Sequence, residues 1–210
     1  GASRTMQIAQ KLYQGIEIDG ETIGLITYMR TDGTNLSTDA IDTFRKYIKT
    51  EFGEEYVPEN PASYSGKKAK NAQEAHEAIR PTDIMRAPDT VKKYLSPDQH
   101  KLYDLIWSRA LSSQMKPAQF DRNTITITSS DNGTVCKASG SVLKFDGFLK
   151  VMKDNKKDDD EDILPDMKKG PINIESLVDE QHFTQPPPRY SEASLVKKLE
   201  ELGIGRPSTY

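Results

Sequence analysis

Tyr28 and Arg30 are the residues of this chain whose types and spacing best suit chemistry. Side chains two positions apart in an extended segment project to the same face, so both can point into one site. A phenol has an ordinary pKa of about 10, so it attacks well at neutral pH only if its developing charge is stabilised or its proton is removed. The permanently charged fork of Arg30 matches phosphate oxygens, and the pair therefore suits attack on a phosphodiester.

Spacing alone does not make Tyr28 and Arg30 an active site. A half-buried strand tyrosine beside a solvated arginine gives the same pattern and is the commoner case. The pair needs independent support from longer stretches of the sequence.

Three long segments supply that support. They are GLITYMRTDGTNLS at 24–37, AQEAHEAIRPTD at 72–83 and FTQPPPRYSEASLVKKLEELGIGRPSTY at 183–210. All three resemble signature segments of the bacterial type IA DNA topoisomerases, in that family's order. The tyrosine of this family lies in a YMRTDxTNLS context, which Tyr28 matches. The resemblance runs with gaps from Ser3 to Tyr210, although 151–181 carries little of it.

The resemblance implies a pair of transesterifications on DNA. Tyr28 would attack a phosphodiester of single-stranded DNA, giving a 5′-phosphotyrosine and a free 3′-hydroxyl, and the reverse step would reseal the strand. Repeated cycles would relax negative supercoils without ATP. Arg30 matches the family's catalytic arginine and would stabilise the transferring phosphoryl group. His76 matches a family histidine that would bind the phosphate or position the strand, whereas without the resemblance an ordinary structural histidine is favoured.

Further residues match segments that the family uses to contact DNA. Some of them can instead shape a turn or cap a helix, and Arg80 can equally be an exposed or structurally paired arginine. The DNA-binding candidates are Thr27, Thr31, Asp32, Asn35, Arg80, Arg206, Ser208 and Thr209. Gly33 occupies a position where the family signature tolerates small residues, and no functional weight is given to it.

Two other readings remain open. A tyrosine recombinase also uses Tyr with Arg and His, but the spacing from His76 to Arg80 is one residue too long for its His-x-x-Arg motif, and Tyr28 precedes rather than follows them. A non-catalytic winged-helix DNA-binding module is the second alternative. Replacing Tyr28 with Phe separates it from the enzyme, because only the enzyme would lose covalent capture of DNA.

The resemblance also predicts what the chain works with. The family binds Mg²⁺ through an acidic cluster on a separate N-terminal domain, and no DxD pattern precedes Tyr28. We therefore expect a fragment without a metal site of its own, inactive in relaxation by itself. Its partners would be single-stranded or negatively supercoiled DNA and that metal-binding domain.

Composition is compatible with this reading. The 210 residues are 35% hydrophobic and 29% charged, with a net charge of −3. Removing the acidic run at 158–162, which is most simply a solvated loop, would change that net charge to +2. No apolar run approaches a membrane span and no secretory signal opens the chain, so the cytoplasm is the expected location. The single Cys136 excludes an internal disulfide.

Hydrophobic periodicity predicts helices in the first half of the chain. Apolar spacing and caps favour helices at 3–14, 37–52 and about 97–114, the last burying Leu102, Leu105, Ile106 and Leu111. A strand would carry Tyr28, and a short helix ending at Pro81 would carry His76.

The second half is predicted to be richer in strands. Thr124 to Thr128 and Val135 to Ala138 read as a hairpin with a turn at 131–133. Residues 172–178 have the pattern of a further strand. Three prolines at 186–188 predict a stiff linker, and the pattern of 191–202 predicts an amphipathic helix.

The sequence therefore predicts an α+β fold in three parts. Residues 1–114 would form a helical, winged-helix-like tyrosine domain. Residues 115–182 would form a β-rich arch segment with the acidic loop, and 183–210 would begin the domain that lines the single-strand groove. In this family the arch hinges a gate that lifts while the cut strand stays attached.

Overall fold

Helices and strands both contribute to the fold, as the α+β prediction requires. The computed structural model describes residues 1–31, 33–64, 76–130, 133–152, 169–173, 175–176 and 178–205. Its helices are α1 (Ala2–Gln14), α2 (Thr38–Glu51), α3 (Pro88–Val91), α4 (Pro97–Ser112) and α5 (Glu192–Glu201), with short 3-10 turns η1 (Glu54–Tyr56), η2 (Lys92–Tyr94) and η3 (Gly147–Lys150). Its strands are β1 (Ile16–Ile18), β2 (Glu21–Ile23), β3 (Gln119–Thr128) and β4 (Val135–Phe145).

A small hairpin that the sequence analysis did not predict follows the first helix. Strands β1 and β2 pair antiparallel directly after α1. Asp19 and Gly20 connect them with φ angles of 52° and 89°. Two successive positive φ angles characterise the tight turn that Asp-Gly favours in a two-residue hairpin loop. Asp-Gly is therefore a signal in the sequence for this hairpin.

Helices α2 and α4 begin where their caps predict. The Ser37 hydroxyl accepts from the backbone N–H of Ala40 at 3.3 Å. At the start of α4, Ser96 and Gln99 form a reciprocal capping box, with Pro97 at the first helical position. These side chains satisfy backbone donors that have no partner within the helix, which fixes the helix starts.

The buried face of α4 agrees with the prediction at Leu102, Ile106 and Leu111 but not at Leu105. Leu105 was expected inside but is 51% exposed, while Tyr103 and Leu111 are fully buried. The Tyr103 hydroxyl donates to the Arg86 carbonyl at 2.7 Å, and the Trp107 indole N–H donates to the Ile84 carbonyl at 3.0 Å. Two aromatic residues whose polar atoms find backbone partners thus face the core, and Leu105 lies on the other side of the helix.

A single core holds the first 115 residues together, here called the helical region. Among the described residues, its buried side chains come mainly from α1, the segment after β2, α2, the segment at 84–91 and α4. Its largest fully buried members are Tyr103, Phe44, Leu12, Leu25, Ile26, Ile48, Ile84 and Leu111. No helix among the described residues is both long and apolar enough to cross a membrane.

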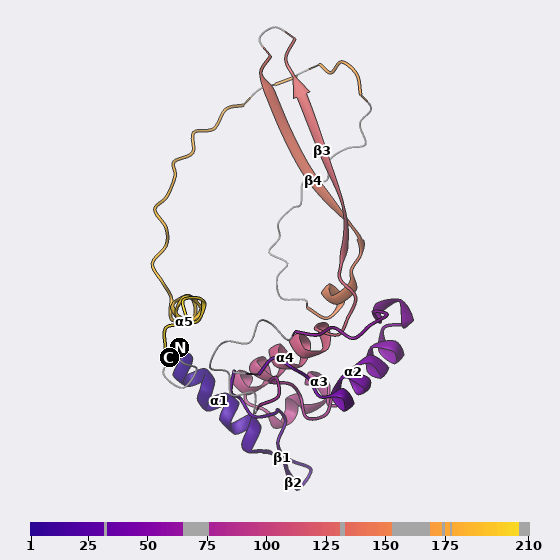
Figure 1. The fold of residues 1–210 in the computed structure, drawn as a ribbon, viewed down its shortest axis with the longest axis vertical. Coiled ribbons are helices and arrows are strands. Elements are labelled where there is room, and N and C mark those ends of the chain that lie inside the picture. The colour runs from indigo at the N-terminus through magenta and orange to yellow at the C-terminus, as the bar shows by residue number, and fades with distance from the viewer. Residues whose placement is uncertain are drawn as a thin grey trace.

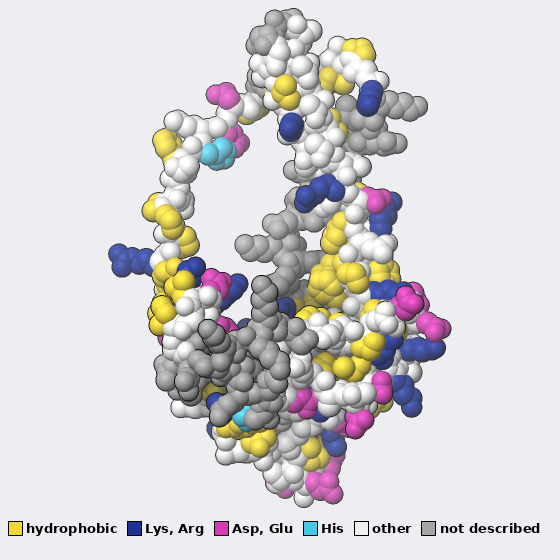
Figure 2. Space-filling view, viewed as in Figure 1, with side chains coloured by type: hydrophobic (Ala, Val, Ile, Leu, Met, Phe, Trp, Pro, Cys, Tyr) yellow, Lys and Arg dark blue, Asp and Glu magenta, His cyan; other side chains and the backbone are white. Residues whose placement is uncertain are grey.

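Strands β3 and β4 form the predicted hairpin, which is longer than expected and projects from the helical region as an arm (Figure 1). The lower end of this arm is fixed. The Tyr56 hydroxyl donates to the Asp146 carboxylate at 2.8 Å, and the Phe148 N–H donates to the Lys116 carbonyl at 2.9 Å. Figure 2 shows hydrophobic side chains gathered where the arm meets the helical region, where Phe145 packs against the core.

The remaining described residues lead to α5. The strand expected over 172–178 is absent from the described positions of that range, which have no regular structure. Helix α5 is confirmed, with a capping box formed by Ser191 and Ser194. It lies beside the start of α1 (Figure 1), where the Glu192 carboxylate accepts from the Ala2 N–H at 2.7 Å. The acidic run at 158–162 lies outside the described residues, as do two of the three turn residues at 131–133.

Candidate active site around Tyr28

Tyr28 lies in an extended segment that enters the core and then leaves it. Leu25 and Ile26 are buried, and Tyr28 is 39% exposed. Met29 is buried again and Arg30 is half-buried. This alternation agrees with the prediction that Tyr28 and Arg30 share one side of the segment. The predicted strand is wrong as a ladder: among the described residues, this segment forms an isolated bridge between Ile26 and Pro81 and belongs to no sheet.

Two aromatic rings flank the ring of Tyr28. The ring centroid of Tyr13 lies 5.1 Å from that of Tyr28. The ring centroid of His76, which is far from Tyr28 in the sequence, lies 5.4 Å from that of Tyr28. Both separations fall in the range of favourable tilted aromatic contacts. His76 therefore lies next to Tyr28, as expected, and Tyr13 also contacts the Tyr28 ring.

Tyr13 was not predicted as a site residue. It belongs to the last turn of α1 and is 41% exposed. The Leu25 N–H donates to the Leu12 carbonyl at 2.8 Å, which holds the end of α1 against the tyrosine segment. Sequence spacing gave no sign of this contact, because the β1–β2 hairpin intervenes and returns the chain to α1.

His76 is not on a helix. The described part of the expected helix, 76–81, is not helical: it has a bend at Ile79 and a bridge at Pro81, and 71–75 lie outside the described residues. Its backbone pairs with another segment: the Thr27 N–H donates to the Arg80 carbonyl at 2.9 Å and the Thr82 N–H donates to the Leu25 carbonyl at 3.0 Å. Backbone groups used in this way are unavailable for a helical turn, which explains the wrong prediction.

The Thr27 hydroxyl takes part in the same pairing. It donates to the Ala78 carbonyl at 2.8 Å and accepts from the Arg80 N–H at 2.9 Å. Thr27 was a DNA-binding candidate. In the structure its hydroxyl joins the residue before Tyr28 to the 76–81 segment.

Gly33 packs against the other side of the 76–81 segment. A Cβ at this position would lie 1.9 Å from the His76 carbonyl oxygen, far inside van der Waals contact. The Ala78 N–H also donates to the Asn35 carbonyl at 2.9 Å. Gly33, to which the sequence gave no weight, is therefore required for the close approach that brings His76 to Tyr28.

Glu77 connects three parts of the site. One carboxylate oxygen accepts from Arg80 Nε at 2.7 Å and from the Ser37 N–H at 2.8 Å, and the other accepts from Arg80 Nη2 at 3.1 Å. Arg80 Nη1 donates to the Pro81 carbonyl at 2.9 Å. Burial alone would raise the pKa of Glu77, but the hydrogen bonds from Arg80 and Ser37 together hold that pKa below its ordinary value.

The remaining candidates lie around this centre or outside the described residues. Thr31 and Asn35 are exposed in the loop that leads to α2. The candidates outside the described residues are Asp32, Arg206, Ser208 and Thr209.

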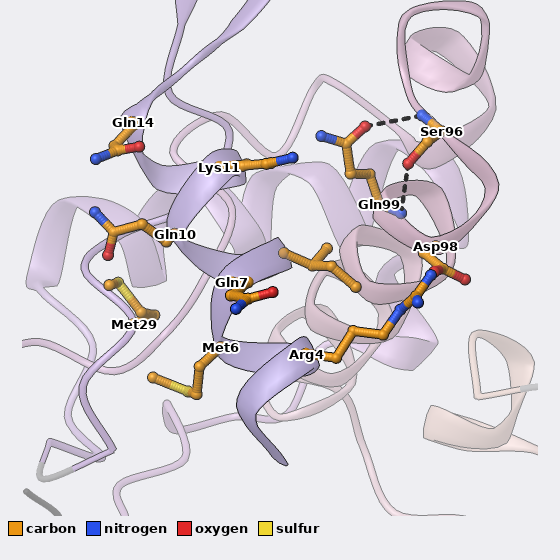
Figure 3. A pocket seen from close by; sticks show the side chains of 11 residues that line it. Arg4, Met6, Gln7, Gln10, Lys11, Gln14, Met29, Ser96, Asp98 and Gln99 are labelled. Carbon is orange, nitrogen blue, oxygen red and sulfur yellow. Dashed lines mark hydrogen bonds and ion pairs between the residues drawn. The ribbon is translucent and has the colours of Figure 1, made fainter. Parts of the chain in front are cut away.

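A hollow of about 800 Å³ lies near the site but does not contain Tyr28 (Figure 3). It is bounded by α1 and by the start of α4, where Arg4 forms an ion pair with Asp98. Met29 lines it. Since Met29 and Tyr28 are neighbours on opposite sides of an extended segment, the tyrosine faces away from this hollow.

Comparisons with known proteins decide the family. A family model described as DNA topoisomerase matches residues 1–210. The chain belongs to this family of DNA topoisomerases. It is 54% identical to DNA topoisomerase 1 of Rickettsia felis and 47% identical to that of Helicobacter pylori, over 100% and 99% of its own length. Full-length topoisomerase I from Thermotoga maritima is similar in structure, with a TM-score of 0.71 and 41% identity over 99% of this chain.

These relatives are much longer than the chain. It spans 27% of the Rickettsia protein, 28% of the Helicobacter protein and 32% of the Thermotoga chain. The type IA topoisomerase family predicted from Tyr28 and its surrounding motifs is thus confirmed. The relatives contain further residues outside the region that this chain matches.

A topoisomerase of this type is expected to use Mg²⁺. Among the described residues, no group of three or more His, Cys, Asp or Glu side chains comes together as metal ligands would. The carboxylate of Glu77, the residue after His76, already accepts three hydrogen bonds. The described residues therefore do not fit a Mg²⁺ site.

Proposed function

We propose that this chain supplies the strand-cleaving tyrosine of a type IA DNA topoisomerase, which cuts and rejoins one DNA strand and so relaxes negative supercoils. The observation that carries this proposal is the position of Tyr28. Its ring is 39% exposed, lies beside His76 and shares a side of its segment with Arg30. A nucleophile must be accessible and must have a charge-stabilising group near it, and this arrangement supports both requirements.

The reaction is a transesterification in each direction. The Tyr28 oxygen attacks the phosphorus, a phosphotyrosine bond to the 5′ side forms, and the bond to the 3′ oxygen breaks. The phenol proton leaves and the 3′ oxygen gains one, so the strand ends in a 3′-hydroxyl. Because one phosphodiester replaces another, the reverse attack by this hydroxyl reseals the strand without ATP.

Arg30 and His76 are proposed to act on the phosphate. The guanidinium of Arg30 would offer paired N–H donors to the non-bridging oxygens, whose charge grows during transfer. The imidazole of His76, already in contact with the Tyr28 ring, would donate a hydrogen bond to the same phosphate or orient the strand. Thr31, Asp32 and Asn35, and Arg206, Ser208 and Thr209, are proposed to contact the neighbouring nucleotides.

The other parts of the chain are proposed to move the cut strand. The helical region would be the winged-helix-like tyrosine domain, the arm would belong to the arch, and α5 would begin the groove domain. Mg²⁺ would be held by the family's N-terminal metal-binding domain, which we propose as the partner that completes the cleavage site. The 210 residues alone would then bind single-stranded DNA without relaxing a plasmid.

Covalent capture tests this proposal. The chain is mixed with the separately produced metal-binding domain of a relative, Mg²⁺ and an oligonucleotide labelled at either its 5′ or its 3′ end, and is then denatured. We expect label on the protein from the 3′-labelled strand only, and none with Tyr28→Phe. Tyr13→Phe is the matched control, since it keeps the neighbouring ring and should still form the adduct.

Two outcomes would overturn the proposal. Capture of the 5′-labelled strand would indicate a 3′-phosphotyrosine and a different class of enzyme. The absence of any adduct, with the two proteins shown to associate and DNA shown to bind, would leave a non-catalytic DNA-binding module.

A further inference from the structure

Arg80 faces the interior of the site. Its side chain is 16% exposed and that of its partner Glu77 is 28% exposed. The two groups form a paired contact, with Nε and Nη2 of Arg80 on the two oxygens of Glu77, and Nη1 on the Pro81 carbonyl. This guanidinium gives three of its five N–H donors to the protein, and its charge is paired with a carboxylate, so it is poorly suited to bind a DNA phosphate as well.

Glu77 extends the contact to the start of α2. The carboxylate oxygen that accepts from Arg80 Nε also accepts from the Ser37 N–H, the N-cap position of α2. A negative charge is favourable there, because the backbone donors at a helix start have no partner within the helix. Glu77 thus ties the 76–81 segment to the loop that follows Tyr28.

The same segment is tied to the residue before Tyr28. Thr27 bonds to Ala78 and Arg80 through its hydroxyl, and to Arg80 again through its backbone N–H. The stretch that holds Tyr28 therefore runs between two anchors, Thr27 and Ser37, which contact the same short segment. Neighbouring positions of this segment present His76 to the Tyr28 ring.

We propose that Glu77 and Arg80 are positioning residues for Tyr28: their ion pair fixes the 76–81 segment between Thr27 and Ser37 and so holds His76 against the tyrosine. This inference rests on the proposed function. It assigns Arg80 a role through Glu77 and not through contact with DNA. It also gives Glu77, which the sequence did not single out, a part in the rate of strand cleavage.

A phosphate-binding Arg80 would behave differently when Glu77 is removed. If Arg80 bound DNA, Glu77→Ala would free it from a competing carboxylate and tighten DNA binding, while Arg80→Ala would weaken binding and reduce its salt dependence by about one phosphate contact. If the two residues position Tyr28, both substitutions slow cleavage at saturating DNA and leave affinity nearly unchanged. The direction of the Glu77→Ala effect on affinity therefore separates the two roles.

The first measurement is the rate of adduct formation as a function of oligonucleotide concentration, in the mixture with the metal-binding domain. For Glu77→Ala and Arg80→Ala we expect the maximal rate to fall about tenfold or more, because small displacements of a nucleophile are costly. The oligonucleotide concentration that gives half the maximal rate should stay within about twofold of that for the unaltered chain, because neither substitution removes a contact with DNA. The double variant should be no slower than the slower single variant, because the two residues act as one unit.

Two variants guard against a merely structural effect. Glu77→Gln keeps an acceptor for the Ser37 N–H and for one donor of Arg80, and should recover most of the maximal rate. Glu54→Ala removes a carboxylate from the exposed pair that Glu54 makes with Lys49, where the side chains are 79% and 60% exposed, and should change nothing.

Amide hydrogen exchange on the chain alone provides a readout that needs no activity. The N–H groups of Thr27, Ala78 and Arg80 lie in the tied segments. They should exchange faster in Glu77→Ala and stay protected in Glu54→Ala. Unchanged exchange, or an unchanged cleavage rate in Glu77→Ala, would overturn the positioning role, and so would tighter DNA binding by that variant.

Failure of the proposed function is distinguishable from failure of this inference. If the unaltered chain forms no adduct, the chemistry assigned to Tyr28 fails. The exchange experiment then still decides whether Glu77 and Arg80 hold the 76–81 segment, because it does not depend on DNA.

Discussion

The helical region and the arm are stabilised in different ways. The buried hydrophobic side chains among the described residues lie between Ala9 and Met115, within the helical region. The arm has ten paired positions along β3 and β4, but its residues are exposed or half-buried. Packing therefore holds the first part, whereas backbone hydrogen bonds hold the second.

This difference suits the roles proposed for the two parts. The proposed nucleophile Tyr28 needs a fixed position, and the residues that precede it in its segment, Leu25 and Ile26, are buried in the core. A two-stranded hairpin is only marginally stable by itself, so the arm depends on its base. There the Tyr56 ring lies 5.0 Å from the Phe145 ring, and the Tyr56 hydroxyl bonds to Asp146. The arm is thus a projection with one fixed end.

The largest expected effect is a core truncation in the helical region. Trp107→Ala removes an indole that is 7% exposed and hydrogen-bonded to the Ile84 carbonyl. We expect the free energy of unfolding to fall by about 3 to 5 kcal/mol, the range for deleting a large buried aromatic side chain. Urea unfolding followed by far-ultraviolet circular dichroism measures this loss.

Val135→Ala is the matched truncation in the arm. Val135 is 53% exposed, so the free energy of unfolding should change by no more than about 0.5 kcal/mol. A loss at Val135 as large as that at Trp107 would show that the arm has a core of its own, and the contrast between the two parts would be wrong.

A smaller effect is expected at the junction of the two parts. Tyr56→Phe keeps the ring against Phe145 but removes the hydroxyl that donates to Asp146. One hydrogen bond to a charged acceptor contributes about 1 to 2 kcal/mol, so a loss of that order is expected. The amides of Lys116 and Phe148, which bond at the junction, should exchange faster with solvent while those of α4 stay protected.

Tyr64→Phe serves as the control for the junction. The Tyr64 hydroxyl also donates a hydrogen bond, to the Ser113 carbonyl at 2.8 Å, but the residue is 52% exposed and its partner belongs to the end of α4 and not to the arm. It should leave the exchange of Lys116 and Phe148 unchanged. Equal effects of the two substitutions would argue that Tyr56 does not fix the arm.

Local signals in the sequence predicted the helices and the arm well. The caps at Ser37 and Ser96 are formed as predicted, because a cap is decided by residues within one turn of the helix start. The helix expected over 191–202 is also present and is capped by Ser191. Alternating Thr and Ile at 124–128 likewise predicted a strand that pairs with the following one.

Features that depend on tertiary contacts were missed or wrong. The sequence of the 76–81 segment favours a helix, but its backbone hydrogen bonds with Thr27 and Leu25 keep it out of one. The Tyr13 contact with Tyr28 and the close approach at Gly33 join residues whose distance in space is set by the whole fold. Family motifs therefore identified Tyr28, Arg30 and His76 as candidates, whereas the residues that hold them became visible only in three dimensions.

The smallest expected effect is the acid sensitivity of the junction. The hydrogen bond from Tyr56, assisted by Lys150, holds the pKa of Asp146 below its ordinary value of 3.8. A carboxylate with a depressed pKa in the folded state contributes stability that is fully present above its unfolded pKa and is lost as the pH falls through the folded pKa. Thermal unfolding of the unaltered chain and of Asp146→Asn, compared from pH 7 to pH 2, measures this contribution.

The difference in melting temperature between these two proteins should be constant near neutral pH and should shrink below about pH 4, because Asp146 gains a proton there whereas Asn does not titrate. Tyr56→Phe, which removes the main cause of the shift in the pKa of Asp146, should show a smaller loss of stability over this pH range than the unaltered chain. A difference that stays constant down to pH 2 would mean that the carboxylate of Asp146 does not stabilise the junction. The arm would then be held by the contact of Phe145 with Tyr56 and by the backbone bonds at Lys116 and Phe148.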